Sequence, residues 1–323
     1  MIAGAFASAI GGTVQSVRAQ RMQTHMPPGV APGPKGPLVF LDYDKAEIDA
    51  AYDQSLWAPN RAEIAKRNAQ MSAAAVARLG EPRRLAYGPT AIERVDVYVA
   101  KRPNAPINIF IHGGAWRVGS AAAYAYLAEL FVDSGAHFVA VDFNNVIETG
   151  GDLLPMADQV RRAVAWVYRN AAQFGGNPNR LYVSGVSSGA HLASVVLTTD
   201  WKKDFGLPVD LIKGGLCASG MYDLFPVSLS ARNTYVKFTD AVVEALSARR
   251  HLERLVAPIV VAYGTLETPE FQRQSSEFAD AVRSMGKPVT LLVGEGYNHF
   301  ELHETLGNPY GLLGRAVLAQ MKR

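Results

Sequence analysis

Short apolar runs alternate with amphipathic segments along most of the chain. The runs are rich in β-branched residues and nearly continuous, as in residues 107–111 and 259–262. Such runs are typical of strands that are buried on both faces of a parallel sheet. The pattern predicts seven strands: Arg94–Ala100, Ile107–His112, His137–Asp142, Arg180–Ser184, Leu211–Ala218, Ile259–Gly264 and Pro288–Gly294.

Helical segments separate these strands. Their apolar residues recur every three to four positions, which is the period of a helix with one buried face. The alternation of strands and helices predicts one α/β domain, with a mostly parallel central sheet and helices on both faces. The predicted helices are Ala121–Ser134, Leu154–Phe174, Ala190–Thr199, Phe271–Met285 and Tyr310–Lys322.

The start of the chain differs in composition from the rest. Residues 1–12 are almost wholly small or apolar, so residues 1–19 resemble a secretory signal that is cleaved after Ala19. A signal would send the protein to the periplasm or out of the cell. The alternative, a plain apolar tail, would leave it cytoplasmic. We expect the signal.

Residues 20–37 are predicted to be a stiff extended arm, because five prolines and three glycines fall within positions 26–37. Helical patterns follow over Asp44–Leu56 and Arg61–Leu79, so the main domain, residues 38–323, is expected to begin with a helical extension. The arm could pack on its own subunit or clasp a second copy of the chain, and we expect a homodimer.

The segment from residue 221 to residue 255 is too long for a simple connection between two strands. It carries four aromatic residues, Tyr222, Phe225, Tyr235 and Phe238. We predict a small cap over the functional site, since long inserts with structure of their own are usually functional. An ordinary pair of surface helices is the alternative.

The composition is that of an ordinary globular protein, with 49% apolar residues, 19% charged residues and a formal net charge of +3. Basic residues are scattered, which argues against a nucleic-acid partner. No stretch reaches the ~20 apolar residues of a membrane-spanning helix. The one cysteine, Cys217, excludes an internal disulfide and is expected to be a buried hydrophobe rather than a nucleophile.

The strongest sign of chemistry is the sequence Gly185-Val-Ser187-Ser-Gly189, which lies between a predicted strand and a predicted helix. A serine on such a tight turn needs neighbours without side chains, hence a glycine two residues away on either side. The turn holds the hydroxyl at the N-terminal end of a helix, whose dipole favours negative charge. Ser187 is the predicted nucleophile, and a glycine turn with an idle serine is the alternative.

A second glycine motif, His-Gly113-Gly114-Ala-Trp, follows the strand at residues 107–112. Attack by a serine places negative charge on the carbonyl oxygen of the substrate. Each fixed donor beside that oxygen is worth about 2.7–4 kcal/mol in the transition state. We predict an oxyanion hole made by the N–H groups of Gly113, Gly114 and Ser188, with a plain glycine turn as the alternative.

The predicted base is His299, in the loop after the last predicted strand. A serine nucleophile needs a histidine that removes its proton, and chain order favours one near the C-terminus. The other six histidines lie in the arm, the glycine motif, a strand or helices, and His303 is the one close rival.

The predicted acid is Glu267, which follows the strand at residues 259–264. Either type of carboxylate can accept the imidazole N–H and orient the base. Asp223, after the preceding strand, is the runner-up. Glu270 is expected to be an N-terminal residue of the following helix.

These residues predict acyl transfer through a covalent acyl-serine intermediate. No metal or organic cofactor is expected, because no set of His, Asp or Cys residues has the spacing of ligands. Trp116, Tyr222 and Phe225 are expected to line the substrate pocket, which favours a small ester with an apolar or aromatic portion.

Together the motifs resemble the arylformamidase (kynurenine formamidase) branch of the α/β-hydrolases, within the wider hormone-sensitive-lipase-like esterases. The resemblance implies an α/β-hydrolase fold. It also implies that the family's nucleophile falls on Ser187, its base on His299 and its oxyanion glycines on Gly113 and Gly114. It covers the chain from about residue 38 to the end, and the matching pieces are residues 41–44, 51–54, 112–116, 185–191, 268–275 and 298–300.

At the acid position the family carries aspartate, whereas this chain has the longer Glu267. The carboxylate must then withdraw by one methylene, which implies a rearranged site. We therefore expect a carboxylic ester as the substrate. Hydrolysis of an amide or formamide is the second expectation, and a non-catalytic binding module with the same fold is the third.

Overall fold

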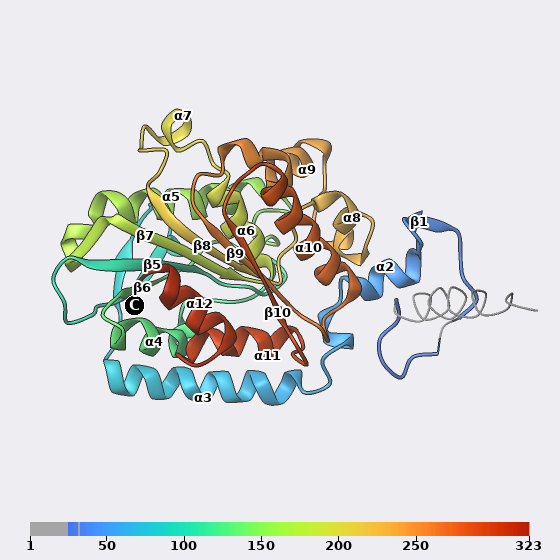
Figure 1. Cartoon of the computed structure of the whole chain (residues 1–323), viewed down its shortest axis with the longest axis horizontal. Helices are drawn as coiled ribbons and strands as arrows, with labels where there is room; N and C mark the ends of the chain where they lie inside the picture. Colours follow the sequence, from blue (N-terminus) through green and yellow to red (C-terminus); the bar gives the residue numbers. More distant parts are fainter. Residues whose placement is uncertain (1–24, 32, 323) are drawn as a thin grey trace, which may run out of the picture.

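A computed structural model describes residues 25–31 and 33–322, so the predicted signal segment lies outside the described residues. Eight strands form one sheet in the order β10-β9-β8-β7-β5-β6-β4-β3 (Figure 1). All neighbours from β10 to β6 run parallel, and β4 and β3 add an antiparallel edge. The strands are β3 (Arg83–Ala86), β4 (Arg94–Tyr98), β5 (Ala105–Ile111), β6 (His137–Val141), β7 (Gly176–Val186), β8 (Ile212–Ala218), β9 (Ile259–Gly264) and β10 (Val289–Gly294).

The seven predicted strands are all present, and the prediction of a mostly parallel sheet is confirmed. The strand β7 is longer than the predicted Arg180–Ser184 and begins at Gly176. The edge strand β3 was not predicted. Its sequence, Arg-Arg-Leu-Ala, has no apolar run because it lies at the rim of the sheet, where most of its side chains remain exposed.

Helices cover both faces of the sheet, as predicted. The helices α5, α6 and α10 pack on one face, whereas α4, α11 and α12 pack on the other, with α3 outside them (Figure 1). The predicted helix at 121–134 consists of a 3-10 helix, η2 (Ala122–Leu127), which is kinked at Tyr124, followed by α4. The helices are α3 (Arg61–Leu79), α4 (Ala128–Asp133), α5 (Leu154–Asn170), α6 (Ser188–Leu197), α10 (Pro269–Ser284), α11 (His299–Glu304) and α12 (Leu312–Gln320).

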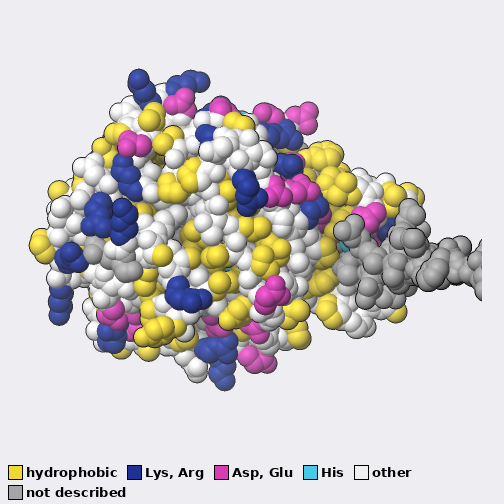
Figure 2. Space-filling model, in the orientation of Figure 1, with side chains coloured by type: hydrophobic (Ala, Val, Ile, Leu, Met, Phe, Trp, Pro, Cys, Tyr) yellow, Lys and Arg dark blue, Asp and Glu magenta, His cyan; other side chains and the backbone are white. Residues whose placement is uncertain are grey.

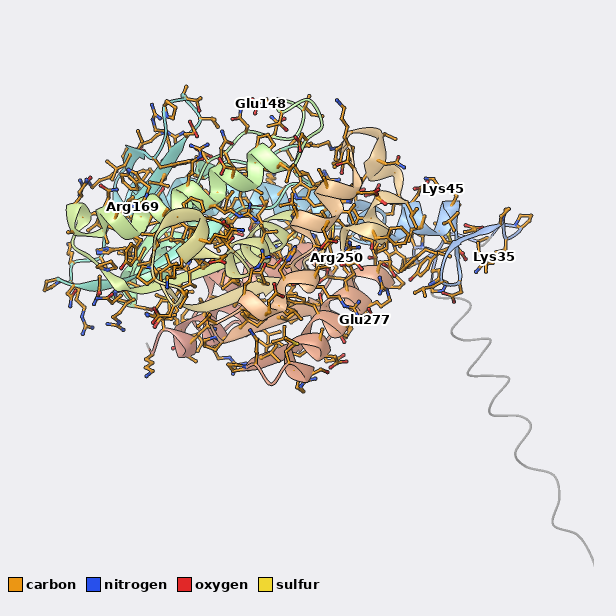
Figure 3. The ribbon with its side chains drawn as sticks, turned by 90° about the horizontal axis from the view of Figure 1, so that it is seen from above. Lys35, Lys45, Glu148, Arg169, Arg250 and Glu277 are labelled. Carbon is orange, nitrogen blue, oxygen red and sulfur yellow. The ribbon has the colours of Figure 1, made fainter. Side chains whose placement is uncertain are left out.

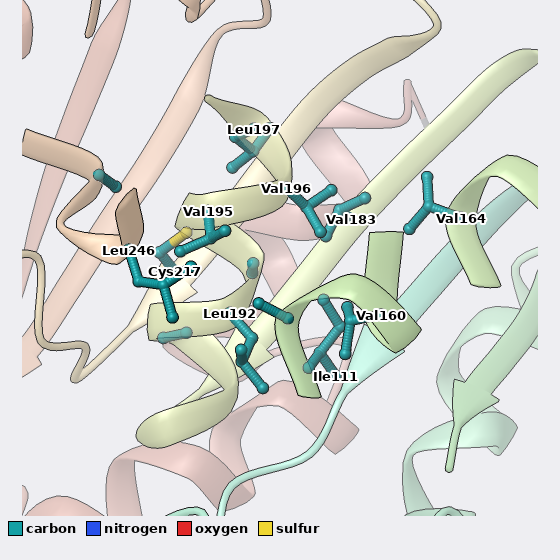
Figure 4. Packing of buried hydrophobic residues seen from close by; sticks show 14 of the residues in the cluster. Ile111, Val160, Val164, Val183, Leu192, Val195, Val196, Leu197, Cys217 and Leu246 are labelled. Atoms are coloured by element: carbon teal, nitrogen blue, oxygen red, sulfur yellow. The ribbon is translucent and has the colours of Figure 1, made fainter. Parts of the chain in front are cut away.

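Successive side chains along each strand point to opposite faces of the sheet, so a hydrophobic core forms on each face. In β5, Ile107, Ile109 and Ile111 point into the core beneath α5 and α6, whereas Phe110 points into the opposite core. The same alternation holds in β6 to β9. Figure 4 shows part of the first core, with valines and leucines of α5, α6 and β7 and with the buried Cys217 beside Val195 and Leu246. Each such side chain contributes about 1.5–3 kcal/mol by burial.

The parallel strands all end at one edge of the sheet, and the segments that follow them meet there. The glycine motif follows β5, Ser187 follows β7, Ser219 follows β8, Glu267 lies after β9 and His299 after β10. In open α/β sheets this carboxyl edge is where ligands bind. The fold therefore brings the predicted chemistry to one place.

Two further parts of the chain flank this edge. At the N-terminus, α2 (Lys45–Ala51) and a 3-10 turn (Gln54–Leu56) form the predicted helical extension. The segment 221–255 forms α8 (Leu224–Ser228), α9 (Asp240–Leu246) and two 3-10 turns, η4 (Ala231–Thr234) and η5 (Ala248–Arg254).

Charged side chains of both signs are interspersed over the face drawn in Figure 2. Figure 3 labels six of them, which are spread over the molecule from Arg169 at one end to Lys35 at the other. Within the described residues, no helix has both the length and the apolar character needed to cross a membrane.

The central position of Ile109 allows a test of the fold. Ile109 is fully buried in β5, so Ile109→Ala should lower the free energy of unfolding by about 2–5 kcal/mol through lost burial and a cavity. In the control, Val209→Ala, the side chain is 53% exposed, and the change should stay within about 0.5 kcal/mol. Urea denaturation measures both. Equal effects would contradict the two-layer packing described here.

Candidate active site

Ser187 lies on a strained turn between β7 and α6. Its backbone has φ 56° and ψ −128°, a combination that is costly for a residue with a side chain. A Cβ at Gly185 would collide with the carbonyl oxygen of Gly189, and a Cβ at Gly189 would collide with that of Ile111. Both glycines are therefore required for the turn to pack against the end of β5.

Three side chains form a hydrogen-bonded chain at this turn. The Nε2 atom of His299 lies 3.0 Å from the Oγ of Ser187, and its Nδ1 lies 2.8 Å from the Oε2 of Glu267. A neutral imidazole fits both contacts when it carries its proton on Nδ1, since it then donates to the carboxylate and accepts from the hydroxyl. The order and geometry are those of a serine–histidine–acid triad.

The carboxylate of Glu267 is fully buried and receives four hydrogen bonds. Besides His299, the Ser219 hydroxyl and the Gly264 N–H donate to Oε1 at 2.6 and 2.8 Å, and the amide of Gln54 donates to Oε2 at 3.3 Å. Burial raises the pKa of Glu267, and the nearby His303 imidazole and the donors oppose that rise. These donors stabilise the ionised form that an imidazolium requires.

The imidazole of His299 is poised to be neutral at rest. Burial lowers the pKa of His299, and the positive charge of Arg232 adds to the shift. A neutral ring can accept a proton from Ser187, which is the property of a general base. The ring of His303 stands 4.4 Å from that of His299, but no hydrogen bond joins His303 to Ser187 among the described residues.

The glycine motif lies directly against the serine. A Cβ on Gly113 would come within 3.1 Å of the Cβ of Ser187. Gly114, Ala115 and Trp116 all have positive φ values, of 117°, 55° and 62°, so the loop turns sharply here. The N–H of Trp116 donates to the hydroxyl of Ser188 at 3.2 Å, which fastens the loop to the start of α6.

A buried histidine joins this loop to the segment 221–255. Nδ1 of His191 accepts from the indole N–H of Trp116 at 3.1 Å, and its Nε2 donates to the carbonyl of Leu246 at 3.0 Å. Because both ring nitrogens are engaged, the neutral tautomer is fixed. Burial lowers the pKa of His191 to about 4. Its role is to position Trp116.

Not every residue predicted for the site is brought to it. Tyr222 is buried in the core, where its ring stacks on Phe278 at 4.1 Å and its hydroxyl donates to the Cys217 carbonyl. Phe225 is 49% exposed and meets Phe40 edge-on. Trp116 does lie beside the serine, but its indole is covered. Tyr222 and Phe225 therefore serve packing and do not line the space beside Ser187.

The alternative acids have other partners. Asp223 caps α8 by accepting from the N–H of Phe225. Glu270 lies in the first turn of α10, as predicted, and pairs with Arg273. Cys217 is a buried residue of β8, as predicted, and burial raises the pKa of its thiol to about 12.

Three contributors to the site escaped the sequence analysis. Ser219 and Gln54 hold the acid. Ser219 could have been noticed as a polar residue that directly follows an apolar strand, as Ser187 does. Arg232, in η4, places a buried guanidinium near His299. The sequence carries no indication of this role for Arg232, because a single arginine in a segment with aromatic residues forms no recognisable motif.

Small cavities flank the glycine loop. One, of about 250 Å³, is lined by Tyr52, Ala115 and Arg232 among others. The other, of about 200 Å³, borders Gly113 and Ser188. Both are below the usual range of ~300–1,000 Å³ for drug-sized ligands. Within the described part of the chain, no three His, Cys, Asp or Glu residues are grouped as metal ligands.

Comparison with known sequences gives a consistent result. A family model described as BD-FAE matches residues 95–297. The kynurenine formamidase of Danio rerio is 33% identical over 85% of this chain and 95% of its own length. The isoprenylcysteine alpha-carbonyl methylesterase of Arabidopsis thaliana is 24% identical over 68% of this chain and 56% of its own. The predicted resemblance to formamidases and esterases is confirmed.

Solved structures share the fold. An esterase of Pyrobaculum calidifontis matches with a TM-score of 0.64 at 20% identity, covering 83% of this chain and 95% of that chain. A thermophilic esterase of Thermogutta terrifontis, solved with propionate bound, matches with a TM-score of 0.62 at 18% identity, covering 75% and 95%. The predicted α/β-hydrolase fold is confirmed.

The turn around Ser187 can be tested through its glycines. Gly189→Ala should cost about 3 kcal/mol of stability or more and abolish hydrolysis, because its Cβ would meet a backbone oxygen that cannot move away. In Gly33→Ala the new methyl group meets nothing within 4 Å, so that control should retain wild-type behaviour. Thermal melting and ester hydrolysis measure the two effects. A stable and active Gly189→Ala protein would refute the described turn.

The buried histidines predict a loss of stability in acid. The folded-state pKa of His191 is about 4, below its ordinary value of 6.5, and burial also lowers the pKa of His112 and His137. At pH values between the folded-state pKa and the ordinary pKa of a histidine, the unfolded chain binds a proton that the folded chain does not. The contribution of these histidines to stability is therefore fully present only above about pH 6.5 and should be lost as the pH falls toward 4.

Urea midpoints at about pH 7.5 and pH 5 measure this loss. His191→Gln removes one of the titrating groups, so its midpoint should change less between the two pH values than that of the wild type. A wild-type protein that is equally stable at both values would contradict the prediction.

Proposed function

The chain belongs to the BD-FAE family of α/β-hydrolases, and from the geometry of its site we propose that it cleaves a carboxylic ester through a covalent acyl-serine intermediate. The family and the fold make it a hydrolase of esters or amides that acts on small molecules. The observation that carries the proposal is the hydrogen-bonded chain from Ser187 through His299 to Glu267.

In the first step, Nε2 of His299 removes the proton from the Ser187 hydroxyl as its oxygen attacks the substrate carbonyl. The imidazolium that forms is stabilised by the Glu267 carboxylate at Nδ1. His299 then gives the proton to the leaving alcohol, which departs and leaves an acyl-serine. Water, activated by the same imidazole, attacks the acyl group and releases the carboxylic acid.

The oxyanion of each tetrahedral intermediate would be held by backbone N–H groups of Gly113, Gly114 and Ser188. Support comes from the contact between Gly113 and Ser187 and from the place of Ser188 as the first residue of α6. Because these donors are fixed by the fold, they need no reorganisation as charge develops. The helix dipole adds to the stabilisation.

Hydrolysis of a formamide is the second candidate. It is favoured by the similarity to a kynurenine formamidase over nearly the whole length of that relative. The same triad would serve, with protonation of an amine leaving group by His299 as the added requirement. The small cavities beside the glycine loop suit a short acyl group, such as formyl or acetyl, in either reaction.

The nucleophile is tested by Ser187→Ala. This variant should lower kcat for p-nitrophenyl acetate by about 10⁴-fold or more, since removal of a triad nucleophile leaves only binding and the oxyanion hole. It should also lose labelling by a fluorophosphonate probe. The matched control is Ser284→Ala, at the exposed end of α10, which should keep both properties.

Retained turnover in Ser187→Ala, or labelling of a different serine, would refute the proposal. Hydrolysis of p-nitrophenyl acetate and of N-formylkynurenine, measured side by side on the wild type, decides between the ester and the formamide. A wild type that hydrolyses neither and is not labelled would favour the non-catalytic module.

A further inference from the structure

Arg232 is a buried cation with no acidic partner among the described residues. Its side chain belongs to η4, in the segment 221–255, and the residue is 8% exposed. Its Nε and Nη2 donate to the carbonyl of Tyr52 at 3.1 and 2.8 Å, and its Nη1 donates to the hydroxyl of Tyr235 at 3.3 Å. Both acceptors are neutral groups. A buried charge normally has a counter-ion, because desolvation is costly.

Arg232 lines a cavity of about 250 Å³ whose wall also includes Ala115 of the glycine loop. It lies over the indole ring of Trp116, with its carbon 5.4 Å from the ring centre. The lowered pKa of His299, to which its charge contributes, agrees with its nearness to the triad. The cavity therefore lies beside the glycine loop, next to the residues proposed to hold the substrate carbonyl.

The acids around this cavity are engaged elsewhere. Asp49 forms an ion pair with Lys45 at 2.5 Å, and Asp53 accepts from the N–H and hydroxyl of Ser55. Arginine has five N–H donors, of which Arg232 uses three on these neutral groups. Two remain for a ligand.

We propose that Arg232 binds a carboxylate on the substrate, so that the enzyme prefers esters or amides bearing an anionic group a short distance from the bond that is cleaved. The inference rests on the proposed function and names the substrate class of the same site. A carboxylate in the cavity would supply the missing counter-ion and accept the two remaining N–H groups. Arg232 is then a specificity-determining residue.

The test uses two esters of the same shape, 3-carboxyphenyl acetate and its uncharged amide, 3-carbamoylphenyl acetate. The wild type should prefer the carboxylate. Arg232→Met should lower kcat/KM for the carboxylate by about 10- to 100-fold, as expected for a lost charge-assisted hydrogen bond, and for the amide by less than about threefold. Arg232→Lys keeps the charge and should restore part of the preference.

The comparison variant is Arg117→Met, at the same cavity, where the arginine is exposed and stacks on Tyr235. Its effect on the preference should be below about threefold, because solvent screens an exposed charge. If Arg232 serves only to hold Tyr52, its replacement will slow both esters equally and Arg232→Lys will not restore the ratio. That result would overturn the inference.

A binding measurement separates this inference from the proposed reaction. Calorimetric titration of Ser187→Ala with 3-carboxyphenyl acetate should show binding that Arg232→Met, in the same background, weakens by about 10-fold or more. If Arg232→Met does not fold, Arg232→Gln replaces it in both experiments. Binding without turnover in the wild type would refute the proposed function alone, whereas turnover without preference for the carboxylate would refute the role of Arg232 alone.

Discussion

A carboxylate that is removed from water needs hydrogen-bond donors in place of water. In this protein the hydrogen bonds to Glu267 connect the segments at the ends of three strands, β8, β9 and β10. An unpaired buried charge costs several kcal/mol. The four donors to Glu267 come from the N-terminal extension, from Ser219 after β8, from the end of β9 and from α11. A shift of any one segment would remove a hydrogen bond from the buried carboxylate. The position of His299 is therefore fixed by the requirement that Glu267 keeps all four donors.

Backbone strain is concentrated around the same point. Ser187, Ala115, Trp116 and Ser219 all have positive φ values, and residues held in such conformations cost of order 1–3 kcal/mol each. Backbone hydrogen bonds hold two of these residues in place. The N–H of Ser187 donates to the Ala218 carbonyl, and the N–H of Ser219 donates to the Ala262 carbonyl. The stability of the two cores offsets the strain, and two of the strained residues place their hydroxyls against the triad, Ser187 at His299 and Ser219 at Glu267.

The sequence analysis succeeded where a local pattern has a single physical meaning. Apolar runs located seven of the eight strands of the sheet, and the glycines around Ser187 indicated a turn that side chains would block. It failed where position depends on distant contacts. Tyr222 was predicted to line the pocket because it is aromatic. The start of the segment 221–255 instead lies in the hydrophobic core, where the ring of Tyr222 stacks on that of Phe278. The partnership of Gln54 with Glu267 joins residues 213 positions apart, which no spacing reveals.

The N-terminal extension is part of the site. The carbonyl of Tyr52 holds Arg232, the carbonyl of Ala51 accepts from Thr268, and the amide of Gln54 reaches Glu267. One short stretch thus contacts the acid on one side and the buried cation on the other. In the proposed mechanism the acid orients the base and the cation orients the substrate, and this stretch sets the separation between the two. A change in its packing would therefore alter turnover and substrate preference together, even though none of its side chains touches the serine.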